Sequence, residues 1–117
     1  MGTFLLPDGQ EYKIQKDKYQ RARGAAQMLE IYCSICNSLL YIYQKDGPGP
    51  LLRCYLDRIA WPKEYTELAK ANTKYSNLEK ITCPNCGKLI ATPMNYKKED
   101  RVAFRMQRGS FKKKKRG

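Results

Sequence analysis

Two short cysteine motifs constrain this chain more than any other feature of its sequence. Cys33-Ser34-Ile35-Cys36 and Cys83-Pro84-Asn85-Cys86 each place two thiols on one tight turn. Pro84 and Gly87 favour such a turn, and Asn37, which tolerates a positive φ, stands where the first motif lacks the glycine. A tetrahedral Zn²⁺ site needs four thiolates at about 2.3 Å from the ion. The sequence therefore predicts one structural Zn²⁺ ion held by Cys33, Cys36, Cys83 and Cys86.

These paired motifs resemble the zinc-ribbon class, whose members hold a metal between two Cys-x-x-Cys knuckles on antiparallel β-hairpins. The resemblance covers the four cysteines and the strand-like runs beside them, and it implies a small antiparallel sheet around a structural zinc. Residues 37–82 separate the two pairs, more than the roughly 15–20 residues of the commonest ribbon spacing. Two other interpretations stay open, an iron site with rubredoxin-like ligation and a redox dithiol.

The residue types that are missing restrict the chemistry. The chain has no histidine, which excludes Cys-His and Ser-His-Asp arrangements and histidine proton shuttles. Cys54, the fifth cysteine, has no histidine to activate it and is expected to be a small buried residue. A site closed by four protein thiolates leaves no position for an activated water. We expect no catalytic residues, no cofactor besides the one zinc, and a protein that is not an enzyme.

Positive charge is gathered near the two ends of the chain. The formal net charge is +12 over 117 residues. Residues 97–117 hold ten Lys/Arg against two acids, and residues 13–23 hold five against one. Clustered positive charge suits a polyanion, of which nucleic acid is the commonest. The alternative interpretation is a solubilising surface, or a receptor-read address at residues 112–116.

The expected function is therefore non-catalytic, zinc-dependent nucleic-acid binding, with RNA or a ribonucleoprotein such as the ribosome favoured over duplex DNA. Tyr12, Tyr19, Tyr96 and Phe111 are candidates for base stacking next to this charge, although packing roles compete. The expected phosphate contacts are Lys13, Lys16, Lys18, Arg21, Arg23, Arg101, Arg105, Arg108, Lys112, Lys113, Lys114, Lys115 and Arg116.

Two other functions compete with this one. A zinc ribbon can serve as a protein–protein adaptor, for example on the transcription machinery, and an iron site would indicate a redox protein. No apolar run approaches 18 residues, and residues 1–8 lack the basic start and apolar length of a signal peptide. We expect an intracellular, cytoplasmic monomer without membrane contact, or a nuclear one in a eukaryote.

The expected fold class is α+β, with one zinc-ribbon-like domain over residues 1–108 and a flexible basic tail over 109–117. Runs at Thr3–Leu6 and Glu11–Ile14 flank Asp8-Gly9 and predict an N-terminal hairpin. Apolar residues at helical spacing predict a helix over residues 18–30, with Asp17 as its cap.

The middle of the chain is expected to supply the sheet and an inserted helix. Leu39–Lys45 and Leu51–Asp57 flank a Gly/Pro-rich loop and predict a second hairpin. Trp61-Pro62 opens a helix over about 62–75, inserted between the two knuckles. Predicted strands follow at Glu79–Thr82 and Leu89–Ala91, with Pro93 at a sheet edge, and Arg101–Arg108 alternates like a strand.

Overall fold

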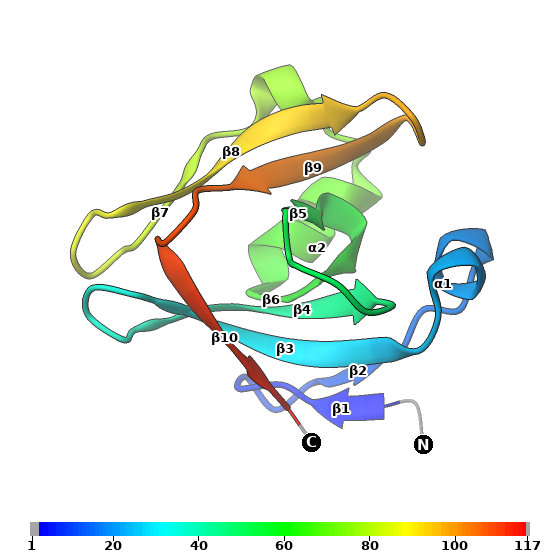
Figure 1. The fold of residues 1–117 in the computed structure, drawn as a ribbon, viewed down its shortest axis with the longest axis horizontal. Helices are drawn as coiled ribbons and strands as arrows, with labels where there is room; N and C mark the ends of the chain where they lie inside the picture. The colour runs from blue at the N-terminus through cyan, green and yellow to red at the C-terminus, as the bar shows by residue number, and fades with distance from the viewer. Residues whose placement is uncertain (1–2, 117) are drawn as a thin grey trace.

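The computed structural model describes residues 3–116, and these form an α+β fold with two four-stranded antiparallel sheets and a two-stranded hairpin (Figure 1). The expected fold class is confirmed. The strands are β1 (Thr3–Leu5), β2 (Glu11–Lys13), β3 (Ala26–Cys33), β4 (Leu39–Asp46), β5 (Arg53–Tyr55), β6 (Ile59–Trp61), β7 (Ile81–Thr82), β8 (Leu89–Tyr96), β9 (Arg101–Met106) and β10 (Phe111–Lys115). The helices are α1 (Lys18–Arg23) and α2 (Lys63–Lys70), with 3₁₀ turns η1 (Leu56–Arg58) and η2 (Tyr75–Asn77).

The main hydrophobic core draws on both four-stranded sheets. The first sheet has the order β10-β3-β4-β6 and the second the order β5-β9-β8-β7. Ile31 and Tyr41 from the first sheet and Ile90 and Phe104 from the second are almost fully buried in one cluster. Figure 1 shows β3 and β4 across the lower half of the view, β8 and β9 across the upper half, and α2 between them. Burying this apolar surface holds the two sheets together.

The N-terminal hairpin covers the other face of the first sheet. β1 and β2 pair in the expected antiparallel manner, with Phe4 opposite Tyr12. Leu6 packs in a second cluster with Met28 of β3 and Ile42 of β4. Met28 is therefore buried on the face of β3 opposite to the one that carries Leu29 and Ile31, so both faces of this strand hold a buried apolar residue.

The helix expected over residues 18–30 is wrong beyond Arg23. α1 is capped by Asp17 as predicted, but it ends at Gly24, whose φ is +115°. Residues 26–33 then form β3. Ala26 and Leu29 fit helical spacing by chance, while Leu29 and the two alternate residues after it face the core as a strand does.

The hairpin expected over residues 39–57 is also wrong. β4 pairs with β3 and β6, whereas β5 pairs with β9 of the second sheet. The Gly/Pro-rich segment at residues 47–50 therefore carries the chain from one sheet to the other. Consequently the two knuckles lie on two sheets, where the ribbon prediction placed them on one.

The other expected elements are present with different lengths. The inserted helix spans Lys63–Lys70, and β7, β8 and β9 occupy the predicted strand regions. The pairing of β7 with β8 ends at Ala91. Within the described residues, Pro93 therefore has a strand partner on one side only, in β9, which agrees with its predicted position at a sheet edge. Among residues 3–116, no helix combines the length and apolarity that crossing a membrane requires.

The flexible tail expected over residues 109–117 is contradicted up to residue 116, while Gly117 lies outside the described residues. Phe111–Lys115 is β10, which pairs in antiparallel register with β3 from Cys33 to Leu29. Arg116 adds a backbone hydrogen bond to the Met28 carbonyl at 2.7 Å. Phe111 also packs against the main core, so this segment has partners in β3 and in the core that its own charge pattern does not reveal.

Candidate metal centre and basic groove

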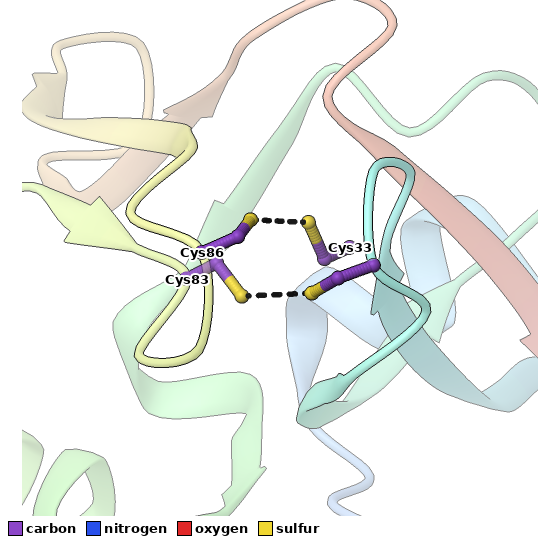
Figure 2. A group of neighbouring side chains, drawn as sticks. Cys33, Cys83 and Cys86 are labelled. Carbon is purple, nitrogen blue, oxygen red and sulfur yellow. Dashed lines mark hydrogen bonds between the residues drawn. The ribbon is translucent and has the colours of Figure 1, made fainter.

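The two knuckles come from different sheets and bring four sulfurs to one point. The first knuckle joins β3 to β4, and the second joins β7 to β8. All four Sγ atoms lie within 4.8 Å of one another, with Cys33–Cys86 and Cys36–Cys83 both at 3.5 Å. Figure 2 shows Cys83 and Cys86 facing Cys33 across this centre. Sulfurs 2.3 Å from a tetrahedral ion are roughly 3.8 Å apart, so the four thiols fit a four-thiolate metal site.

The same backbone hydrogen bonds close both knuckles. The N–H of Cys33 donates to the carbonyl of Ser38 at 2.9 Å, and the N–H of Cys83 donates to that of Lys88 at 2.8 Å. Each bond spans five residues and fixes where the first ligand stands relative to the strand that follows. Backbone hydrogen bonds within the protein therefore close both turns.

Hydrogen bonds and neighbouring thiols push the cysteine pKa values in opposite directions. The Asn85 side chain and then the Ser38 hydroxyl, which lies 3.2 Å from Sγ, lower the pKa of Cys36 to about 5. A backbone N–H from Lys88 lowers the pKa of Cys86, but burial and the three other thiols together raise it to about 12. The pKa of Cys33 is lowered as well, chiefly by the backbone N–H of Cys36, so the cluster favours thiolates at Cys33 and Cys36 and opposes further negative charge at Cys86. A bound cation would relieve this repulsion.

Ser110, in the turn between β9 and β10, ties the first knuckle to the second sheet. Its carbonyl accepts from the Ser34 N–H at 3.0 Å, and its own hydroxyl lies 3.2 Å from the carbonyl of Ile90. Ser34 also donates to the carbonyl of Gly109 at 2.8 Å. Sequence reasoning missed this buried serine, because a serine in a turn carries no periodic or motif signal.

Compared with known protein families, with curated proteins and with solved structures, the chain gives no match. The candidate metal site therefore rests on the cysteines of this chain and their geometry.

The expected phosphate-binding residues do not all reach solvent. Arg101 is only 6% exposed, and it donates to Asp57 at 2.8 Å and Glu99 at 3.1 Å. Its guanidinium lies 4.1 Å from the ring centroid of Tyr19 and 3.9 Å from that of Tyr55. Arg101 is therefore engaged by two acids inside the protein, which leaves its guanidinium little available to a phosphate, and its phosphate contact stays a prediction.

The other candidates divide into paired and unpaired cations. Arg23 bonds to Glu99, and Arg116 lies 3.7 Å from Glu30, which reduces their attraction for a phosphate. Within residues 3–116, no ion pair involves the remaining candidates, all of which are exposed: Lys13, Lys16, Lys18, Arg21, Arg105, Arg108, Lys112, Lys113, Lys114 and Lys115.

A groove of about 740 Å³ gathers several of these unpaired cations beside aromatic and apolar side chains. It is lined by Arg105, Arg108 and Lys113 from the predicted set and by the predicted stacking residues Tyr96 and Phe111. No acidic residue lines it. Its volume is within the range of small-ligand pockets, about 300–1,000 Å³. The structure thus brings together residues that the sequence could only assign separately.

Two arginines important to the structure escaped the sequence analysis. Arg53 lines the groove, and Arg58 is fully buried with bonds to Asp46 at 3.0 Å and Asp17 at 2.7 Å. Both lie in the middle of the chain, where positive and negative charges nearly balance. An isolated arginine in such a region gives no clustering signal.

The remaining stacking candidates have structural partners. Tyr12 donates a hydrogen bond to the Gln44 side chain at 2.9 Å, under the N-terminal hairpin, and burial raises its pKa to about 12. Tyr19 packs against the guanidinium of Arg101. Neither lines the groove, so Tyr96 and Phe111 are the predicted stacking residues that the groove retains.

Proposed function

We propose that this protein binds nucleic acid without catalysis, with RNA or a ribonucleoprotein as its partner. The observation that carries this proposal is the row of four lysines on β10, Lys112 to Lys115. They are exposed, fixed on a paired strand, and without an ion-pair partner among residues 3–116. A row of uncompensated cations on a fixed backbone attracts a polyanion over a long range, and its backbone does not have to become ordered on binding.

The secondary structure favours RNA over duplex DNA as the partner. Reading the major groove of DNA usually requires a helix or β-ribbon inserted into it. α2 packs its apolar residues against the core, and its other face mixes Lys63 and Lys70 with Glu64 and Glu67. A basic strand beside an aromatic groove suits unpaired bases better.

In this proposal the metal is zinc and its role is structural. It cross-links the two sheets through their knuckles, which keeps the groove and β10 in place relative to the second sheet. The hydrogen bonds from Ser110 support the same junction. Elemental analysis of the purified protein would identify the metal, and a red iron-containing protein would contradict zinc.

Salt dependence of binding tests the proposed function. We would titrate fluorescein-labelled single-stranded RNA and duplex DNA with the protein between 50 and 200 mM salt and measure fluorescence anisotropy. The expected slope of log K against log[salt] for the RNA is about −0.7 per phosphate neutralised. Replacing all four β10 lysines by glutamine should flatten this slope, while the Lys63→Gln/Lys70→Gln control on α2 should not. A flat slope for the native protein, or no binding at 50 mM salt, would overturn the proposal.

A further inference from the structure

The basic groove contains two arginines placed directly opposite each other. Arg53 of β5 and Arg105 of β9 are register partners in the second sheet, and both line the groove. Like charges directly opposite on a sheet are destabilising. Within residues 3–116 neither arginine forms an ion pair. An anion bound between them would remove this repulsion, so the pair marks a place where an anionic ligand is favoured.

Arg53 is held in position by neutral groups alone. Its guanidinium carbon lies 3.8 Å from the ring centroid of Tyr96, and its Nε donates to the Tyr55 hydroxyl at 3.1 Å. By contrast, each of four other arginines that are buried or half-buried has a carboxylate partner: Arg23, Arg58, Arg101 and Arg116. In the described part of the chain, the Nη groups of Arg53 make no hydrogen bond. These oriented Nη groups are thus available to donate hydrogen bonds to a phosphate.

The rest of the groove is apolar. Leu52 is 61% exposed although it is a large hydrophobic residue, and Met94 and Phe111 line the same groove. Phe111 is half-buried, because one part of its side chain packs on the core while it also lines the groove. Covering this apolar surface with a flat apolar group would remove it from water, which is favourable. The groove therefore suits a ligand that carries both a negative charge and a flat ring.

We propose that the groove binds an unpaired nucleotide of a single-stranded RNA segment, with a phosphate at Arg53 and Arg105 and the base against Phe111. This inference rests on the proposed nucleic-acid binding and adds where and in what form the nucleic acid binds. A base inside a duplex is already stacked and paired, so its face cannot reach Phe111. Lys113 of β10 also lines the groove and adds a positive charge for the neighbouring phosphate.

β10 offers a matched pair of variants for the test. Lys113 and Lys114 are adjacent, exposed, equally charged and unpaired, but only Lys113 lines the groove. We would measure the affinity of a fluorescein-labelled 12-nucleotide oligouridine and of a 12-base-pair RNA duplex for Lys113→Gln and Lys114→Gln. Two further variants complete the set. Arg53→Lys keeps the charge but loses the planar fork, and Phe111→Leu keeps an apolar side chain but loses the ring. Thermal melting would check that each variant is folded.

The expected pattern is selective. Phe111→Leu should weaken oligouridine binding by about 5- to 150-fold, the range that corresponds to roughly 1–3 kcal/mol per stacked base, and leave its salt slope unchanged. Lys113→Gln should weaken it more than Lys114→Gln and reduce the slope by about 0.7. Arg53→Lys should weaken it without changing the slope, because the charge is retained. Duplex affinity should change less than twofold in Phe111→Leu.

Three results would overturn the inference. If Lys113→Gln and Lys114→Gln weaken oligouridine binding equally and Arg53→Lys has no effect, the groove is not the site although nucleic-acid binding stands. Displacement of oligouridine by poly-glutamate at equal charge concentration would assign the groove to an acidic peptide. If the native protein binds neither probe at low salt, the proposed function itself fails. Since Lys113 is exposed, the paired lysine comparison stays informative even if Phe111→Leu does not fold.

Discussion

Asn37 and Gly87 occupy equivalent places in the two knuckles and share an unusual backbone conformation. Their φ angles are +60° and +79°. The N–H of Asn37 donates to the carbonyl of Cys33 at 3.0 Å, and the N–H of Gly87 donates to the carbonyl of Cys83 at 2.8 Å. Each residue follows the second cysteine of its motif and turns the chain into the next strand. The expected tolerance of asparagine for this position is confirmed.

This equivalence predicts the effect of changing Asn37. Asn37→Val should destabilise the fold by about 1–2 kcal/mol, because a β-branched residue is strained at positive φ. Asn37→Gly should change stability by less than about 1 kcal/mol, since glycine tolerates this φ while the exposed contact from Lys112 to Asn37 at 3.0 Å is lost. Urea unfolding of the two metal-loaded variants measures both values. Equal stability of the valine and glycine variants would contradict the backbone argument.

Loss of one metal ligand should have a larger effect. Cys83→Ser removes a thiol from a cluster that links two sheets. With zinc bound there as proposed, much of the roughly 10–16 kcal/mol of apparent zinc-binding free energy would no longer support folding. We expect the melting temperature to fall steeply and the bound metal to fall below one equivalent, measured by calorimetry and elemental analysis. A chelator should have a similar effect on the native protein.

Cys54 provides the control for that variant. It is fully buried, and its Sγ lies 3.2 Å from the Tyr41 hydroxyl, away from the four-cysteine cluster. Burial raises its pKa to about 12, so it remains a thiol at neutral pH. Cys54→Ala should keep one metal equivalent and lose only the packing of a small side chain. Metal loss in Cys54→Ala would show that the cluster had been assigned incorrectly.

The features that sequence predicted well are those encoded by neighbouring residues. The four cysteines, the turn at Asp8-Gly9 and the cap at Asp17 each depend on residues within a short window, and all were placed correctly. The motif spacing brings two thiols together by local geometry alone. The meeting of the two pairs then follows from the requirement for four ligands.

The features that sequence predicted badly depend on distant partners. The apolar residues between 26 and 33 fit both the period of a helix and that of a strand. This segment forms a strand because it pairs with β4 and β10. Gly47 illustrates this dependence, because a Cβ at this position would clash with the carbonyl oxygen of Arg23. The close approach of these two segments is invisible in the local pattern around either one. The groove was missed for the same reason, since Arg53 of β5 lies far along the chain from the groove residues of β8, β9 and β10.

Because β10 belongs to the first sheet, removing residues 110–117 should destabilise the fold. The flexible tail expected from the sequence would have allowed this deletion without loss of folding. The deletion exposes the edge of β3, removes Phe111 from the core and removes the Ser110 bonds to the first knuckle. We expect a lower melting temperature and weaker metal retention, whereas replacing the four β10 lysines by glutamine should leave both nearly unchanged. An unchanged melting temperature in the deletion would show that β10 contributes little to stability.

Asp17 links the helix cap to the buried Arg58, and its charge should make stability depend on pH. Burial tends to raise the pKa of Asp17, but hydrogen bonds from the Arg58 side chain and from the N–H groups of Gln20 and Tyr19 together hold it below its usual value. A lowered pKa in the folded state stabilises the fold at pH values above the unfolded pKa of about 3.9. This contribution is lost as the pH falls through the folded-state value.

Asp17→Asn isolates that charge, because asparagine is an equally good helix cap. We expect the variant to be less stable than the native protein by about 1 kcal/mol at pH 7, a modest value since the Asp17 side chain is 40% exposed and partly screened. The difference should stay constant down to about pH 5 and shrink below about pH 4, as measured by urea unfolding at each pH. Acid would release a bound metal from the same cysteines in the native protein and in the variant. The effect of this release on stability therefore cancels in the difference between them. A difference that grows toward acid pH would mean that the Asp17 carboxylate does not stabilise the fold through its contact with Arg58.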